Sequence, residues 1–193
     1  LDVDNNSTVS SLSVGHTTPV SIASGKTLSG AITVTDGSIK LGETGTLTST
    51  IAMSGGTLDA DNSSTLSGTL TQSGDITIDV ADGKTLTYSG DEISLGANTL
   101  TMSGEGAFSN TNALDLNNTS SKLLLDSITV NSVSTSADNS GLDVDANSTL
   151  SSLTVGHTTP VSIASGKTLS GAITVTAGSI KLGETGTLAS TVS

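Results

Sequence analysis

Small aliphatic residues recur in this chain as alternating pairs, separated by stretches of Ser, Thr, Gly and Asn. The alternation within each pair is typical of a strand with one buried face. Successive pairs start about 20 residues apart, which is typical of a repeat protein whose coils stack on one another. The pairs start at Leu1, Val20, Ile39, Leu58, Ile78, Leu95, Leu114, Leu142, Val161 and Ile180.

Each regular coil holds an apolar pair, then a central T-L-S stretch, then a second apolar pair, with turn residues between them. One complete coil consists of Ile39 and Leu41, Leu47, and Ile51 and Met53. Strands this short bury too little surface to be stable alone, so the coils must share one continuous core. The pattern predicts an all-β parallel β-helix (β-solenoid) with about 20 residues per coil and about ten coils.

A longer repeat contains the shorter one. Residues 142–193 repeat residues 1–52, and seven of the 52 paired positions differ. The long unit therefore spans seven coils, and its second copy breaks off part-way, so we expect a longer parent protein. We predict a continuous rod with no separate globular domain, in which residues 1–141 form the first unit and 142–193 begin the second.

The step between pairs is irregular from Leu58 to Leu142, whereas it is constant on either side of this region. The longest step runs from Leu114 to Leu142 and contains residues 131–141, with the sequence NSVSTSADNSG. We expect this stretch to form an exposed insertion without core residues, so that deleting residues 132–140 would leave the rod folded.

The composition excludes several classes of function. The formal net charge is −12, and six lysines with no arginine give no basic patch for nucleic acid. No apolar run approaches the roughly 20 residues needed to span a membrane as a helix. The chain has no cysteine and no G-x-S-x-G motif. We predict that it is not an enzyme and needs no cofactor.

One motif suggests a metal site. Oxygen ligands at alternate positions resemble the opening of a calcium loop, although the later glycine and bidentate glutamate of such loops are missing. Calcium binding is therefore one hypothesis for these segments, and solvated acidic edges that discourage aggregation are the other. The candidate ligands are Asp2, Asp4, Asp59, Asp61, Asp143 and Asp145.

A column of threonines is also predicted, because one precedes the central apolar residue of most coils. An exposed hydroxyl ladder on a parallel sheet explains it, and an ice-binding array, which thermal hysteresis would reveal, is an alternative. Its members are Thr8, Thr27, Thr46, Thr65, Thr85, Thr99, Thr149, Thr168 and Thr187. A second column of Ser, Thr and Ala, two residues further on, includes Thr101.

Three segments carry a resemblance to known repeats: ITIDVADGKTLTYSG (76–90), ANTLTMSGEGAF (97–108) and VSIASGKTLSGAITV (20–34). They resemble the repeats of bacterial autotransporter passengers and filamentous-haemagglutinin-like adhesins. The resemblance implies a right-handed parallel β-helix, secretion to the outside of the bacterial cell, and a role in attachment or surface structure. It supplies no catalytic residue that can be placed on this chain.

We therefore expect a stalk or fibre segment of a secreted bacterial cell-surface adhesin. Its partners would be other cell-surface or extracellular-matrix molecules, or further copies in a fibre. The alternative is a glycan- or protein-binding module built from the irregular coils of residues 72–141. That segment holds the only two aromatic residues, Tyr88 and Phe108, which could contact a ligand if either ring were exposed.

Overall fold

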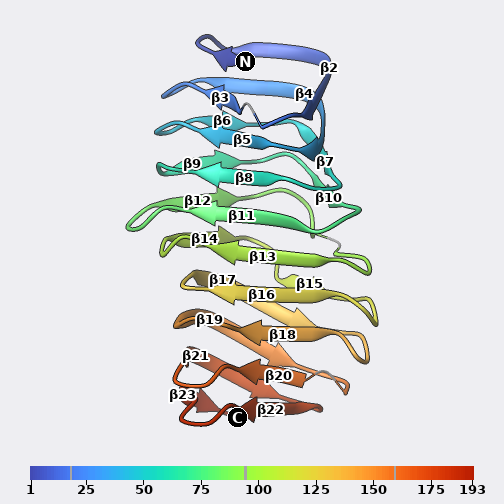
Figure 1. Cartoon of the computed structure of the whole chain (residues 1–193), viewed down its shortest axis with the longest axis vertical. Helices are drawn as coiled ribbons and strands as arrows, with labels where there is room; N and C mark the ends of the chain where they lie inside the picture. The colour runs from blue at the N-terminus through green and yellow to red at the C-terminus, as the bar shows by residue number, and fades with distance from the viewer. Residues whose placement is uncertain (18, 94, 159) are drawn as a thin grey trace.

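The computed structural model describes residues 1–17, 19–93, 95–158 and 160–193. The chain forms an all-β parallel solenoid with about 20 residues per turn and about nine turns. Its turns stack along one axis, with the N-terminus at one end and the C-terminus at the other (Figure 1). The described residues contain no helix. The predicted fold class is confirmed.

Two parallel sheets form the walls of the solenoid. Sheet A has ten strands: β1 (Asp2–Val3), β3 (Val20–Ile22), β5 (Ser38–Leu41), β8 (Thr57–Ala60), β11 (Ile76–Val80), β13 (Thr99–Ser103), β16 (Lys122–Asp126), β18 (Gly141–Val144), β20 (Pro160–Ile163) and β22 (Ser179–Leu182). Sheet B has 13 strands: β2 (Ser7–Gly15), β4 (Thr27–Asp36), β6 (Thr46–Leu47), β7 (Thr50–Met53), β9 (Ser64–Leu66), β10 (Leu70–Gln72), β12 (Thr85–Tyr88), β14 (Ala107–Asn110), β15 (Leu114–Leu116), β17 (Thr129–Thr135), β19 (Ser148–Val155), β21 (Thr168–Val175) and β23 (Thr187–Val192).

Five inward positions recur from coil to coil. In one regular coil they are Ile39, Leu41, Leu47, Ile51 and Met53, all of which are buried. Equivalent residues of neighbouring coils pair in register, so that Leu47 lies between Leu28 and Leu66. Each inward side chain thus packs on its counterparts above and below, and the core is one continuous column of aliphatic side chains.

The long repeat fits this stack without interruption. Its first copy, residues 1–141, supplies seven strands of sheet A, from β1 to β16, and β18 begins the second copy. The last coil of the first copy pairs with the first coil of the second through both sheets, β16 with β18 and β17 with β19. The prediction of seven coils per unit agrees with this arrangement.

The register of sheet A shifts by two residues in the middle of the first unit. Strand β11 has three inward residues, Ile76, Ile78 and Val80, where regular strands have two. Ile78 and Val80 pair with β8, on one side. Ile76 and Ile78 pair with β13, on the other side. The second copy therefore continues the stack two residues out of register with the first.

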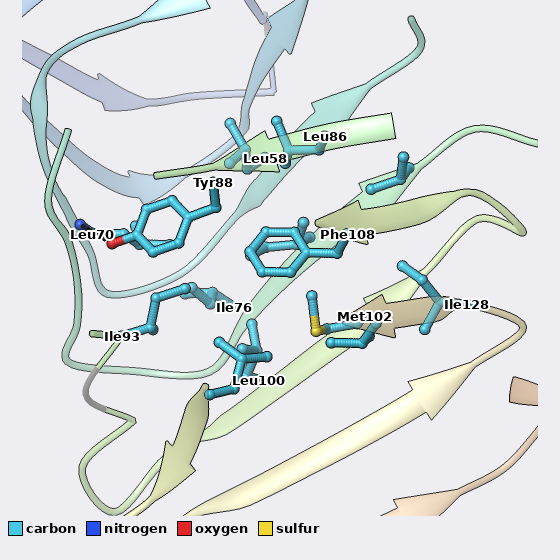
Figure 2. Close-up of a cluster of buried hydrophobic side chains, with 14 of the residues drawn as sticks. Leu58, Leu70, Ile76, Leu86, Tyr88, Ile93, Leu100, Met102, Phe108 and Ile128 are labelled. Atoms are coloured by element: carbon cyan, nitrogen blue, oxygen red, sulfur yellow. Dashed lines mark hydrogen bonds between the residues drawn. The ribbon is translucent and has the colours of Figure 1, made fainter. Parts of the chain in front are cut away.

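The coils that follow this shift are longer. Ile78 pairs with Met102, and Met102 pairs with Leu125. Each of these two coils contains more residues than the regular coil between Val20 and its partner Ile39. The only two aromatic side chains fill the core here. Tyr88 and Phe108 are each 1% exposed, and their rings stack with centroids 5.9 Å apart. Figure 2 shows the rings surrounded by aliphatic side chains.

Two predicted pairs do not lie in sheet A. The pattern predicts that Leu95 and Leu114 begin strands of the same column as Ile78, but the corresponding strands are β13 and β16. Leu114 belongs to β15, which pairs with β17 of sheet B. Leu95 is buried but lies outside the strands. An alternating aliphatic pair looks the same in either wall, so the pattern alone could not assign these residues.

The expected insertion at residues 131–141 is also part of a coil, so this prediction was wrong. Residues 129–135 form strand β17, which pairs with β14, β15 and β19. Val133 and Thr135 are buried, as is Ser140 after the strand. The Thr135 hydroxyl donates to the Gly156 carbonyl and accepts from the Gly156 amide. Deleting residues 132–140 would therefore remove part of the core.

A pair of equivalent leucines tests the dependence on stacking. Leu47 is covered on both sides, whereas its equivalent in the second copy, Leu188, pairs only with Leu169 and is partly buried. Leu47→Ala is expected to lower the free energy of unfolding by about 2–5 kcal/mol, and Leu188→Ala by less than half as much. Urea unfolding followed by circular dichroism measures both. Equal losses would contradict the stacked core.

Candidate functional surfaces

Charged side chains gather on the outer face of sheet A. A column of paired residues runs down this face through Ser21, Lys40, Asp59, Asp79 and Ser103. The Ser103 hydroxyl donates to the Asp79 carboxylate, with 2.5 Å between the oxygens. Ammonium, hydroxyl and carboxylate groups on neighbouring coils therefore lie next to one another along this column.

Lys40 links two of the predicted calcium ligands. Its Nζ lies 2.7 Å from Asp59 Oδ2 and 3.2 Å from Asp61 Oδ2. The hydrogen bonds to Asp59 and Asp61 raise the pKa of Lys40. Desolvation raises the pKa of Asp59, against the lowering effect of the Lys40 hydrogen bond. Because the Lys40 side chain is 41% exposed, we assign this pair no more than about 1 kcal/mol of stability.

The six predicted calcium ligands lie on three separate coils. Asp2 and Asp4 lie on the first, and Asp143 and Asp145 on the first coil of the second copy, where Lys122 Nζ is 3.7 Å from Asp143 Oδ2. Among the described residues, no group of three or more His, Cys, Asp or Glu side chains could hold a metal ion. For Asp59, Asp61 and Asp143, the partner that the fold supplies is a lysine ammonium and not an oxygen cage.

The outer face of sheet B is almost free of charge. Its strands carry Thr, Ser, Ala and Asn outward, and the charged residues within them are Asp36, at the end of β4, and Asp115, in β15. Sheet A strands, by contrast, hold eight charged residues: Asp2, Lys40, Asp59, Asp79, Lys122, Asp126, Asp143 and Lys181. The rod therefore has one acidic, mixed-charge wall and one hydroxyl-covered wall.

The predicted threonine array is interrupted at several coils, since Thr8 pairs with Ser29 and Thr149 pairs with Ser170. Thr27, Thr46 and Thr65 pair in sequence, but Thr65 then pairs with Thr87 and not with Thr85. Thr85 instead pairs with Ala107. Thr99 and Thr101 lie in strand β13 of sheet A. The two-residue shift that divides the core also divides the threonine column, and ice binding stays a prediction without support from a continuous array.

The aromatic residues offer no ligand surface, because both rings are buried. Tyr88 Oη accepts a hydrogen bond from the Leu70 amide at 3.4 Å and donates to the Asp91 carbonyl at 2.5 Å. Desolvation raises the pKa of Tyr88. The hydroxyl is thus engaged by the backbone of the coil. A glycan cannot stack on either ring.

A turn near the junction of the two copies brings a histidine beside a carboxylate. The Asp138 carboxylate accepts hydrogen bonds from the Thr158 amide and hydroxyl, at 2.9 and 3.0 Å, which lower its pKa. His157 Nδ1 lies 3.6 Å from Asp138 Oδ1. This contact crosses between neighbouring coils, and sequence reasoning missed it because the pattern predicts an exposed insertion at residues 131–141.

A shallow, open hollow of about 350 Å³ lies beside the turns that lead from sheet A to sheet B in four successive coils. Its lining includes Asp82, Glu105, Ser127, Asn147 and Thr149. These side chains offer carboxylate, hydroxyl and amide groups to solvent. The hollow falls in and beside the longer coils, which is where sequence reasoning placed the alternative binding module.

No family model, curated protein or solved structure matches this chain. Within the described residues, no helix is long and apolar enough to span a membrane.

Calcium addition tests the carboxylate motif. A ligand that binds only the folded state raises the melting temperature by mass action. Because Lys40 already bridges Asp59 and Asp61, we expect no measurable shift with calcium or after chelation, as followed by circular dichroism. Magnesium at equal ionic strength is the control. Stabilisation by calcium alone would show that the motif binds the ion.

Proposed function

We propose that this chain is a structural stalk or fibre segment of a secreted bacterial cell-surface adhesin, which supplies reach and stiffness. The observation that carries the proposal is the junction between the two copies. There, Lys122 to Leu125 pair in register with Gly141 to Val144, and β17 pairs with β19 over six residue pairs. A linker at this point would allow bending, and the chain has none.

The repeated unit suits a protein whose length is set by the number of units that it contains. Solenoid stability is close to a sum over coils and their interfaces, so each added unit contributes length without a new core. Seven coils at about 4.8 Å make each unit about 34 Å long. The copies are expected to stay nearly identical where their function is to add length. A specialised site in one copy would instead make the copies diverge in sequence.

The charge distribution supports an exposed setting. A formal net charge of −12 favours solubility and keeps the walls of neighbouring rods apart, while most carboxylates lie on sheet A and the turns. The secreted, cell-surface location and the adhesin class rest on the resemblance of the repeats quoted above. The competing idea of a recognition patch within residues 72–141 loses its aromatic contacts, because Tyr88 and Phe108 are buried.

Arrays of the long unit test the proposal. Proteins with one, two and three tandem copies of residues 1–141 are expected to lengthen by about 34 Å per copy in electron micrographs, without bends at the junctions. An array in which Gly-Ser linkers separate the copies is the control, and it should bend at each linker. Native arrays that bend equally would contradict the stalk function.

A further inference from the structure

One ladder of sheet B is interrupted inside the long unit. In a regular coil two strands enter this sheet: β6 pairs with β4 at Thr27 and Leu28, and β7 pairs with the same strand from Ala31 to Val34. We call the pairings of the second kind the second ladder of sheet B. This ladder runs from β2 through β4 and β7 to β10, and again from β15 through β17, β19 and β21 to β23. Among the described strands, none joins β10 to β15.

The coil between β10 and β15 begins with β11 and β12 and continues through residues 89–98, of which 89–93 and 95–98 are described. β11 pairs with both of its neighbours in sheet A, and β12 pairs with both of its neighbours in sheet B. The described residues of 89–98 contain no strand. This coil is therefore held by two ladders, whereas the regular coil of β5, β6 and β7 is held by three.

A tyrosine hydroxyl replaces part of the missing ladder. Tyr88 Oη accepts a hydrogen bond from the Leu70 amide of β10 and donates to the Asp91 carbonyl of its own coil. In Figure 2 the hydroxyl lies beside Leu70, at the end of a ring that is packed among aliphatic side chains. One side chain thus connects the backbones of two coils where strand pairing is missing.

The other bonds at the gap are also made by side chains, and all of them are exposed. Hydrogen bonds that water can replace contribute little to stability. Ile93 and Leu95, both buried, close the core here without belonging to a strand. The exposed bonds join Thr69 Oγ1 to Asp91 Oδ2, Asn112 Nδ2 to the Gly90 carbonyl and Asn117 Nδ2 to Glu92 Oε1, at 3.1, 3.3 and 3.3 Å.

The interfaces of this coil are therefore the weakest within the long unit. In a solenoid each coil is stabilised by its interfaces with its two neighbours. Segments with few backbone hydrogen bonds to their surroundings open at a lower free energy than the whole chain unfolds. Opening at residues 89–98 needs to break the Tyr88 bridge and the exposed bonds and to release Ile93 and Leu95. The ladders of β11 and β12 can stay intact meanwhile.

We propose that residues 89–98 open locally and reversibly, together with the facing edges of β10 and β15, while the coils on both sides stay paired. The long unit then has one point of compliance, fastened by the Tyr88 hydroxyl. Its use as a point of compliance rests on the proposed stalk function, whereas the opening itself does not.

Hydrogen exchange of the whole chain in low urea, followed by mass spectrometry, tests the opening. Amides of β10 and β15 are expected to exchange at least about tenfold faster than those of β7 and β19, which are strands of the same ladder paired on both sides. One opening exposes β10, β15 and residues 89–98 together. Their exchange should therefore share a single dependence on urea, with a smaller slope than global unfolding.

Variants test the fastening. Tyr88→Phe keeps the ring and removes both hydroxyl bonds, so exchange at the opening segment is expected to rise about tenfold while β4 and β21 are unchanged. Asn112→Ala removes the bond to Gly90 from an exposed side chain, and a smaller rise in the same segment is expected. Thr176→Val is the matched control, because it removes a hydroxyl bond to the Val155 carbonyl in a coil with a complete ladder. It should leave exchange at residues 89–98 unchanged.

Three outcomes would overturn the proposal. Protection of β10 and β15 equal to that of β7 and β19 would exclude the local opening. A uniform rise along the chain in Tyr88→Phe would show that the ring only stabilises the core. No change in either Tyr88→Phe or Asn112→Ala would show that these bonds do not fasten the coil. The stalk function would survive each of these results, because it is tested by the length and junctions of tandem arrays.

Discussion

The constraint on which this structure depends is that every coil is stable only against its neighbours. A regular coil such as residues 39–53 contributes five inward side chains and strands of two to four residues. Its backbone hydrogen bonds in sheets A and B run to the coils above and below, not within the coil. Register between coils is therefore the quantity that the sequence must preserve, because a one-residue slip would turn each inward side chain to the solvent.

In the middle of the long unit, the pairing register of sheet A shifts by two residues at strand β11. A shift of two residues keeps the inward face inward, since side chains alternate along a strand. Strand β11 permits the shift because it has a third inward residue. Ile78 and Val80 pair with β8, whereas Ile76 and Ile78 pair with β13. The longer coils that follow enclose more space, and the Tyr88 and Phe108 rings occupy it. The only aromatic residues are thus explained by packing.

The sequence was enough to predict the fold class, the coil period and core positions such as Leu47, because these depend on a pattern repeated many times. It was not enough to place Leu95 and Leu114, because an aliphatic pair fits either wall. The pattern predicts an exposed insertion at residues 131–141 because the step between apolar pairs is longest from Leu114 to Leu142. In a solenoid, however, Thr135 can be buried because its hydroxyl bonds the Gly156 backbone on the next coil. The continuous threonine column failed because the pairing step varies between coils, so that Thr8 pairs with Ser29, Thr65 with Thr87 and Thr149 with Ser170.

Both copies belong to one continuous stack, and a distance measured between equivalent positions of the two copies tests this most directly. The chain has no cysteine, so spin labels can be attached at Ser10→Cys and Ser151→Cys, two exposed and equivalent positions seven coils apart. Double electron–electron resonance should give a single narrow distance distribution centred at about 34 Å, from seven coil spacings. A broad distribution, or one centred far from this value, would contradict a continuous stack across the junction.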